Sequence, residues 1–192
     1  IERVYHRCKL AKRVDHSMVV TSTDSADDAL AVLAREKGIP VFRGSLDDVL
    51  DRFFSAAIAF QPDAIVRVTG DCPLIDSALI DAVLEEFETG KWDHAANVLP
   101  PTFPDGVDVE VFSMETLERA WREGVKDSER EHVTFWMENL DNGLRLGNVA
   151  APADYSHMRW TVDVPSDLEF IRRIYSHFGE VDFGWMDVVN LL

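Results

Sequence analysis

The chain has 192 residues, of which 46% are hydrophobic and 28% charged, as is typical of a globular protein with one well-buried domain. Its 35 acidic and 19 basic side chains give a formal net charge of −16, which repels a phosphate backbone and argues against nucleic acid as the main partner. No apolar run approaches the ~20 residues of a membrane helix and no signal peptide is visible, so we expect a cytoplasmic protein without a membrane partner.

Repeating strand-and-helix units run through the first half of the chain. The sequence opens on an amphipathic helix over residues 2–12, whereas a parallel α/β domain normally begins with a strand, so we expect that an N-terminal strand and the loop after it are absent from this chain. Three units follow, with strands expected at 17–21, 39–42 and 64–66 and helices at 24–38, 46–60 and from Ser77 onward. This alternation predicts an α/β fold with a mostly parallel sheet covered on both faces.

The second half of the chain has a less regular pattern. Residues 99–106 hold three prolines, which fix φ and remove donors, and we expect a loop there. Ser128 with Glu131 has capping-box spacing and predicts the start of a helix that reaches Asn139. The other expected elements are strands at 92–98, 107–112, 144–149 and 160–164 and helices at 114–124 and from Pro165 onward. We see no repeat or linker and expect one domain over residues 1–192.

Helical spacing also predicts which side chains face the core. The expected inward residues are Ala29, Leu30, Val32 and Leu33 in the helix over 24–38, Val49, Leu50, Phe53, Phe54 and Ile58 in the helix over 46–60, and Leu168, Ile171, Tyr175 and Phe178 in the last helix. The apolar run over 64–66 is expected to be a buried strand.

The stretch from Arg67 to Asp76 holds the first candidate site. Gly70 is expected to let the backbone turn sharply after the strand, and Asp76 to cap the following helix. Asp71 then lies just past the carboxyl end of a strand, where α/β folds bind their ligands. A turn or capping role for Asp71 is the alternative, and the local pattern does not separate the two.

A second acid at a strand-to-helix junction is Asp163, which precedes Pro165. Two such carboxylates in one crevice would suit Mg²⁺, which takes one or two carboxylates and completes its shell with water and phosphate oxygens. The alternative is that Asp163 merely precedes a capped helix. No Gly-x-Gly-x-x-Gly or P-loop signature occurs, which disfavours a dinucleotide dehydrogenase or a P-loop ATPase.

The turn before the helix over 46–60 is a weaker candidate. Arg43, Gly44, Ser45 and Asp48 offer a cation, a flexible turn and free N–H groups within a few residues. Such a helix start can hold a ribose or phosphate group. The same residue types are also ordinary helix caps, so both interpretations stay open.

Two further polar groups suit a sugar ligand. Asp105, Asp108 and Glu110 form an acidic cluster, with the last two expected on one strand face, that could hold hydroxyl groups or simply face solvent. Arg130 and His132 lie at a polar helix start, where they could meet an anionic group or serve only the structure.

These groups converge on one family. Residues 41–45 with 48–53, 67–75, 105–112, 130–134 and 159–163 form an ordered set that is specific where each segment alone is not. As a set they resemble the spore-coat-polysaccharide (SpsF-like) type of the cytidylyltransferase family, related to the acylneuraminate and 3-deoxy-manno-octulosonate cytidylyltransferases. The resemblance implies a nucleotide-diphospho-sugar transferase fold, which is a three-layer α/β/α sandwich, and often a homodimer. It also implies transfer of CMP from CTP to an anionic sugar in the biosynthesis of a surface polysaccharide or glycan.

The resemblance also implies a role for each candidate residue. Asp71 and Asp163 would bind Mg²⁺ and be catalytic. The nucleotide-binding residues would be Arg43, Gly44, Ser45, Asp48 and Gly70. The sugar-binding residues would be Arg67, Asp105, Asp108, Glu110, Arg130 and His132. Relatives begin with a strand and a triphosphate-binding loop that we do not expect in this chain, so its activity alone stays open.

Two other functions remain open at this stage. A glycosyltransferase that uses a nucleotide sugar would usually carry an Asp-x-Asp motif after a strand, which Asp108-Val109-Glu110 only approximates. A non-catalytic sugar- or nucleotide-binding module is the other alternative. One fold hosts many activities, so fold-level likeness does not separate these functions.

Overall fold

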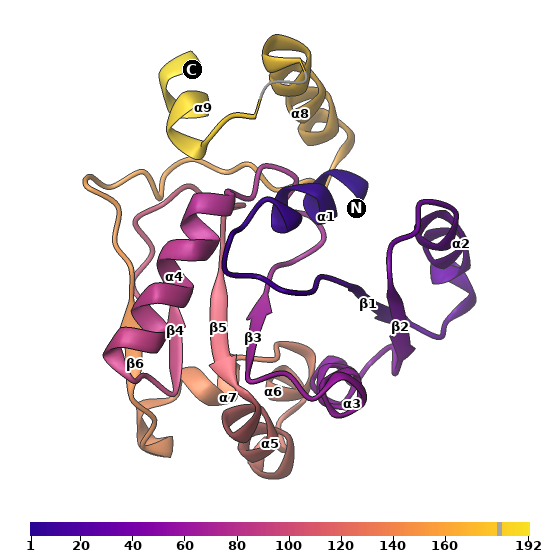
Figure 1. Cartoon of the computed structure of the whole chain (residues 1–192), viewed down its shortest axis with the longest axis vertical. Helices are drawn as coiled ribbons and strands as arrows, with labels where there is room; N and C mark the ends of the chain where they lie inside the picture. Colours follow the sequence, from indigo (N-terminus) through magenta and orange to yellow (C-terminus); the bar gives the residue numbers. More distant parts are fainter. Residues whose placement is uncertain (180–181) are drawn as a thin grey trace.

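The computed structural model describes residues 1–179 and 182–192, which include two hydrogen-bonded sheets (Figure 1). Strand β1 (Val19–Ser22) pairs in parallel with β2 (Val41–Gly44). The second sheet has the order β3-β5-β4-β6 and consists of β3 (Ala64–Arg67), β5 (Glu110–Ser113), β4 (His94–Ala96) and β6 (Leu146–Asn148). β4 and β6 are parallel and β5 is antiparallel to both β3 and β4, so β3, β4 and β6 share one direction. The mostly parallel α/β fold is confirmed.

Helices cover both faces of the larger sheet (Figure 1). One hydrophobic core is shared by α1 (Glu2–Lys9), α4 (Ser77–Gly90), α8 (Pro165–Phe178) and α9 (Trp185–Leu191). A second core is shared by α3 (Val49–Phe60), α5 (Met114–Glu123) and α7 (Phe135–Glu138). The remaining helical elements are η1 (Ser25–Asp27), α2 (Asp28–Glu36), α6 (Asp127–Glu131) and η2 (Leu140–Asn142).

The pleat of β5 separates the two cores. Val111 packs into the core that contains Ile80 of α4, whereas the next residue, Phe112, packs into the core that contains Leu50 of α3 and Leu117 of α5. Successive strand residues point to opposite faces, so a sheet with apolar residues on both faces needs a helical layer on each side. This is the predicted three-layer α/β/α sandwich.

Several expected details differ in the structure because tertiary contacts override the local pattern. β3 lies at the edge of its sheet, and its four residues are half-buried rather than buried. In α2 the buried residues are Ala31 and Ala34, while Val32 and Leu33 are 49% and 39% exposed. Ala34 packs with Val19 of β1 and with Ile39, which precedes β2. The face of α2 that carries the small alanines therefore turns inward, and the face with the larger apolar side chains does not.

Two further side chains predicted to face the core are exposed. Ile58 in α3 is 52% exposed and Leu168 in α8 is 39% exposed. The other predicted residues of α8 do face the core, since Ile171 is buried and Tyr175 and Phe178 pack against the same core partly buried. Ile174 is buried as well, although it was not predicted.

The predicted helix over 128–139 is wrong in its start and its continuity. α6 begins at Asp127 because Glu129 Oε2 accepts hydrogen bonds from the backbone N–H groups of Val125 and Lys126, both at 3.1 Å. The backbone is extended at His132, and a separate helix, α7, begins at Phe135. Ser128 therefore lies inside the first turn and does not cap it.

Two predicted strands are shortened or missing. The predicted strand over 107–112 begins only at Glu110. Before that residue the side chain of Asn97 replaces strand hydrogen bonds, since its Nδ2 donates to Val107 O at 3.0 Å and its Oδ1 accepts from Val109 N at 2.8 Å. Residues 160–164 form no strand. Instead of a strand ladder, Trp160 N donates to Asp105 O at 2.7 Å and Val162 N to Asp71 O at 2.9 Å. This pairing brings two loops that carry acidic residues together.

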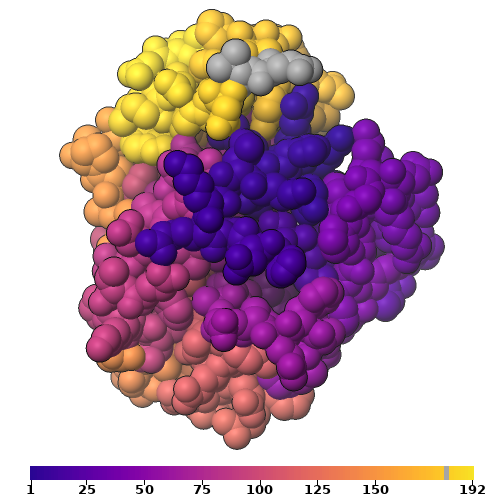
Figure 2. Space-filling model, viewed as in Figure 1, coloured from indigo at the N-terminus to yellow at the C-terminus, as the bar shows by residue number. Residues whose placement is uncertain are grey.

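The N-terminal helix connects the turn after β3 with the C-terminal elements. Arg7 is buried, and its guanidinium donates to the carbonyl oxygens of Ile75 and, at 2.7 Å from Nη2, Phe183. It also lies 4.5 Å from the centroid of the Phe183 ring. Figure 2 shows the indigo N-terminal segment against the yellow C-terminal helices. Within the described residues, no helix is long and apolar enough to span a membrane.

His94 is expected to make stability depend on pH. It is fully buried, neither ring nitrogen has a hydrogen-bond partner among the residues that the structure describes, and burial lowers its pKa from 6.5 to about 4. In the unfolded chain this histidine takes up a proton near pH 6.5, whereas in the folded protein it stays neutral until the pH is near 4. Its contribution to the free energy of unfolding is therefore fully present above pH 6.5 and falls as the pH drops toward 4. We expect a loss of roughly 2 kcal/mol between pH 7.5 and 5 from this group.

Urea unfolding at both pH values measures this loss. His94→Leu should remove that part of the pH dependence, whereas His16→Gln, a substitution of an exposed histidine, should leave it in place. An equal pH dependence in wild type and His94→Leu would contradict the assignment to His94.

Candidate functional site

The turn after β3 is fixed by contacts from three other elements. Asp76 caps α4 as predicted, with its Oδ1 accepting from Ala78 N at 2.7 Å and Leu79 N at 3.1 Å. Its other carboxylate oxygen accepts from Trp185 N at 2.7 Å, and the Tyr175 hydroxyl donates to Pro73 O at 2.7 Å. α4, α8 and α9 thus hold the turn that presents Asp71.

The sharp turn does not require a glycine at position 70. Gly70 is not among the residues with positive φ, and an added Cβ would meet only Ile1, at an ordinary 3.5 Å. A glycine is required instead at position 106, where φ is +106° and an added Cβ would lie 2.8 Å from the backbone of Trp160. That close approach carries the loop with Asp105 against residues 159–163.

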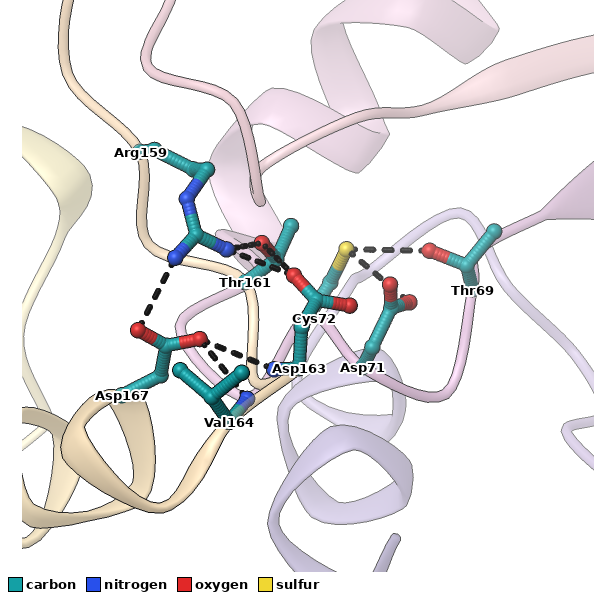
Figure 3. A network of polar contacts seen from close by, with 8 residues as sticks. All are labelled: Thr69, Asp71, Cys72, Arg159, Thr161, Asp163, Val164 and Asp167. Atoms are coloured by element: carbon teal, nitrogen blue, oxygen red, sulfur yellow. Dashed lines mark hydrogen bonds and ion pairs between the residues drawn. The ribbon is translucent and has the colours of Figure 1, made fainter.

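Asp71 and Asp163 are brought together by the backbone. Val162 N donates to Asp71 O at 2.9 Å, which places the two acids on adjoining segments (Figure 3). Asp163 Oδ2 accepts from Thr161 Oγ1 at 2.7 Å and from Arg159 Nη1 at 2.5 Å. The recorded side-chain contact of Asp71 is a weak one, from Cys72 Sγ to Oδ1 at 3.7 Å. Asp71 therefore keeps its carboxylate available, and Asp163 keeps one oxygen.

Arg159 organises the second of these acids. Its guanidinium bonds Asp163 and, through Nη2 at 2.9 Å, Asp167 Oδ1 (Figure 3). Asp167 Oδ2 in turn accepts from the backbone N–H groups of Asp163 and Val164, both at 3.0 Å. These bonds hold the start of α8 and orient Asp163 without consuming its second oxygen. The sequence pattern alone did not assign this role to Arg159 or Asp167.

Asp105 and Asp108 complete an acidic cluster with Asp71 and Asp163. Burial raises the pKa of Asp105, which Arg159 opposes and which Asp71 and Asp163 reinforce. Burial also raises the pKa of Asp108, to about 6, with further contributions from Asp105, Glu110 and Asp71. Repulsion between the acids thus adds to the effect of burial on both pKa values.

The acidic cluster fits a hard divalent cation. Carboxylate oxygens are the ligands that Mg²⁺ prefers, and one or two suffice when water and phosphate supply the rest. Across residues 1–179 and 182–192, no group of three or more His, Cys, Asp and Glu side chains is arranged to enclose a metal alone. A metal-binding role for Asp71 and Asp163 stays a prediction, in which water and phosphate oxygens would supply the other ligands.

Two cavities adjoin this cluster. The larger cavity, about 900 Å³, lies between α1, the turn after β3 and α8, and its lining includes Arg3, Gly70, Asp71, Arg172, Tyr175 and Ser176. The smaller cavity, about 240 Å³, lies at the ends of β3 and β5 beside α7, and its lining includes Arg67, Asp108, Glu110, His132, Thr134 and Glu138. Asp71 lines the larger cavity and Asp108 the smaller one, and the charge of Asp71 contributes to the raised pKa of Asp108.

The smaller cavity contains a buried ion pair. Glu110 is 5% exposed, Arg67 Nη1 donates to its Oε2, and Thr134 Oγ1 donates to its Oε1 at 2.6 Å. Glu138 was not among the predicted residues, and burial raises its pKa. Its sequence signal is weak, since it is one acidic residue after the apolar Phe135–Met137. His132 lines this cavity and packs beside the Phe135 ring, with centroids 4.3 Å apart.

The turn before α3 makes capping contacts. Arg43 donates to Ser22 O at 2.7 Å and Asp24 O at 2.9 Å, and Ser45 Oγ accepts from Asp48 N at 3.0 Å. Asp48 caps α3, accepting from Asp51 N at 2.8 Å. These contacts match the capping interpretation, and the nucleotide role stays a prediction for these residues.

Gly44 and Arg130 are also engaged in the fold. An added Cβ at Gly44 would lie 2.9 Å from Arg52 Cγ, so a small residue is needed for close packing there. Arg130 donates to Asp48 Oδ2 from Nε at 2.9 Å and Nη2 at 2.6 Å, and to Trp121 O at 2.8 Å. Arg130 therefore joins α6 to α3, whereas His132 reaches the smaller cavity.

Comparison with known proteins assigns the family. The family model described as cytidylyltransferase matches residues 1–181. The chain belongs to the cytidylyltransferase family. It is 31% identical to the spore coat polysaccharide biosynthesis protein SpsF of Bacillus subtilis over 198 residues, which cover 100% of this chain and 80% of SpsF. Family membership supports nucleotidyl transfer as the chemistry of this cytidylyltransferase.

Solved structures show the same fold. A cytidylyltransferase of Leptospira borgpetersenii superposes with a TM-score of 0.92 at 31% identity, covering 98% of this chain and 80% of that one. A CMP:2-keto-3-deoxy-manno-octonic acid synthetase complexed with CTP superposes with a TM-score of 0.63 at 16% identity, covering 92% and 87%. At 16% identity, the likeness to this synthetase shows a shared fold and nothing about function. The nucleotide-diphospho-sugar transferase type of fold is confirmed.

Proposed function

We propose that this cytidylyltransferase transfers CMP from CTP to an anionic sugar and releases pyrophosphate, in the biosynthesis of a surface polysaccharide or glycan. The observation that carries the proposal is the pair Asp71 and Asp163, tied by the Val162–Asp71 hydrogen bond of 2.9 Å next to a cavity of about 900 Å³. The family and the relatives SpsF and CMP:2-keto-3-deoxy-manno-octonic acid synthetase support the choice of substrates.

The acid pair would hold Mg²⁺ together with phosphate oxygens of the nucleotide. When bound, Mg²⁺ offsets the negative charge of the transferred phosphate group. Arg159 keeps Asp163 oriented for this role. Among the described residues the carboxylate of Asp71 makes one weak contact, with Cys72, so it is available to a ligand, and the orientation of Asp163 is the preorganised part of the pair. Preorganised charge of this kind is more effective than flexible charge.

The smaller cavity suits the sugar. Arg67 and His132 can meet its anionic group, and the carboxylates of Asp108 and Glu138 can accept hydrogen bonds from its hydroxyl groups. An oxygen of the sugar attacks the α-phosphorus, and the bond between that phosphorus and the bridging oxygen of the leaving pyrophosphate breaks. If the attacking group is a hydroxyl, Asp108 is the acceptor for its proton, since its pKa of about 6 leaves it ionised at neutral pH.

Calorimetric titration with CTP tests the proposal. We expect binding that requires Mg²⁺ and is selective for CTP over ATP and GTP. A folded chain that binds no CTP, or that binds all three nucleotides equally, would contradict it. Once CTP binding is established, pyrophosphate release with a panel of anionic sugars identifies the acceptor. Hydrolysis of a nucleotide sugar would favour a glycosyltransferase instead, and sugar binding without metal dependence would favour a non-catalytic module.

A further inference from the structure

The charges that line the smaller cavity do not balance. The lining includes the carboxylates of Asp108, Glu110 and Glu138. Within the described residues it includes one guanidinium group, that of Arg67, and Glu110 is the ion-pair partner of that group. Asp108 and Glu138 are half-buried, and neither forms an ion pair with any residue that the structure describes. The cavity therefore presents two carboxylates whose charge the described part of the chain leaves without a paired cation.

Glu138 also lies beside a hydroxyl group that is already engaged. Thr134 is one helical turn away, since Glu138 N donates to Thr134 O at 2.9 Å. The Thr134 hydroxyl has a single proton, and Thr134 Oγ1 donates it to Glu110 Oε1 at 2.6 Å. Burial raises the pKa of Glu138, and the charge of Glu110 adds to that effect. A positively charged group bound in the cavity would offset both.

An aromatic wall stands next to these acids. The rings of His132 and Phe135 have centroids 4.3 Å apart, and both residues line the cavity. Phe135 is 48% exposed, whereas the next two residues, Trp136 and Met137, are buried in the core shared with α3 and α5. The faces of aromatic rings attract cations, and ammonium groups of ligands are bound in this way. The wall is thus a second feature, independent of the carboxylates, that suits a cationic group.

We propose that Glu138 selects an acceptor sugar that carries a protonated amino group in addition to its anionic group, with the ammonium between the Glu138 carboxylate and the Phe135 ring. This inference rests on the proposed function and extends it to the class of sugar. Arg67 has five N–H donors, so it can meet the anionic group together with His132 and still keep Glu110. A sugar with negative charge alone would add to the excess of carboxylates, whereas a zwitterion offsets it.

The amino group has no part in the displacement itself. A protonated amine has no free electron pair, so attack on the α-phosphorus stays with an oxygen of the sugar. Glu138 is therefore a specificity-determining residue, and the role of Asp108 as acceptor of a hydroxyl proton is unchanged.

Glu131 provides a matched control for Glu138. It is exposed at the end of α6, is absent from the cavity lining and forms no ion pair within residues 1–179 and 182–192. Glu138→Gln and Glu131→Gln each remove one negative charge and keep the length of the side chain. A difference between the two variants therefore reports the position of the charge and not the total charge of the protein.

Calorimetric titration with glucosamine 6-phosphate, glucose 6-phosphate and N-acetylglucosamine 6-phosphate tests the inference. The first two differ by an ammonium group in place of one hydroxyl, and the third carries the nitrogen without its charge. We expect wild type and Glu131→Gln to bind the amino sugar roughly tenfold or more tightly than the other two, as for one charge-assisted hydrogen bond. Glu138→Gln should lose this preference and keep its circular dichroism. Glucosaminic acid against gluconic acid repeats the comparison with a carboxylate as the anionic group.

Mg²⁺-dependent CTP binding separates the two proposals. If wild type binds CTP selectively but shows no preference for the amino sugar in either comparison, the role of Glu138 is wrong and the proposed function stands. If wild type prefers the amino sugar but binds no CTP, the ammonium site stands and the proposed function is wrong. A preference that survives in Glu138→Gln, or that the N-acetyl compound shares, also contradicts the inference.

Discussion

Replacing Asp71 by asparagine is expected to lower the rate of CMP transfer by roughly 10²–10³-fold while the fold is retained. The amide removes a negative charge from the acid pair, and the loss of one preorganised electrostatic group in an active site has an effect of that order. The loss of stability should be small, because within residues 1–179 and 182–192 the carboxylate of Asp71 makes a single weak contact, with Cys72 Sγ at 3.7 Å. Pyrophosphate release from CTP with an accepted sugar, followed over a range of Mg²⁺ concentrations, measures the effect.

Asp63→Asn is the control for this substitution. Asp63 lies just before β3 and Asp71 follows the same strand at its other end, so both variants lose one charge near the same element. Asp63 is exposed and lines neither cavity, and its variant should keep the wild-type rate. Full turnover in Asp71→Asn would rule out the metal-binding role of Asp71.

The parts of the fold that the sequence predicts are those with local causes. Asp76 is followed by a regular apolar spacing, and the structure confirms that it caps α4 with two backbone hydrogen bonds. The alternation of short apolar runs with amphipathic segments likewise predicts the layered α/β architecture. These signals depend on residues within one or two turns of each other, so they can be recognised without tertiary information.

The errors occur where distant contacts decide the outcome. The segment over 160–164 has strand-like alternation, but its N–H groups find Asp105 O and Asp71 O, so no ladder forms. Strand β5 starts late because Asn97, in another segment, replaces the ladder bonds of Val107 and Val109. Neither outcome can be predicted from a local pattern, because the hydrogen-bond partner that replaces the neighbouring strand lies elsewhere in the chain.

The candidate site shows the same division. Asp71 was recognisable from its position after a strand. Asp163 was predicted from a strand that the structure lacks, yet the bond from Val162 N to Asp71 O places it on a segment adjoining Asp71. The turn before α3 was ambiguous in principle, since the residue types that cap a helix are also those that bind phosphate at its start. In the structure Asp48 caps α3 through Asp51 N, which is a local contact, and also pairs with Arg130, a tertiary contact that the local pattern could not predict.

The second large effect is expected on stability, at the buried pair of Arg67 and Glu110. Their side chains are 17% and 7% exposed, and Glu110 receives its other hydrogen bond from Thr134. Arg67→Met would leave the carboxylate of Glu110 buried without a cation, which typically costs about 3–5 kcal/mol. Urea unfolding of the variant measures the loss. Arg122→Gln, at an exposed i,i+4 pair with Glu118, should change stability by no more than about 0.5 kcal/mol.

A double-mutant cycle isolates the cause of that loss. Glu110→Gln keeps the shape of the side chain and can still accept the hydrogen bond from Thr134, but it carries no charge. If the cost of Arg67→Met comes from the uncompensated carboxylate, the double variant should lose clearly less than the sum of the two single losses. Additive losses would mean that Arg67 acts through packing alone. Coupling would show that the fold depends on a cation at this wall of the smaller cavity, where the sugar is proposed to bind.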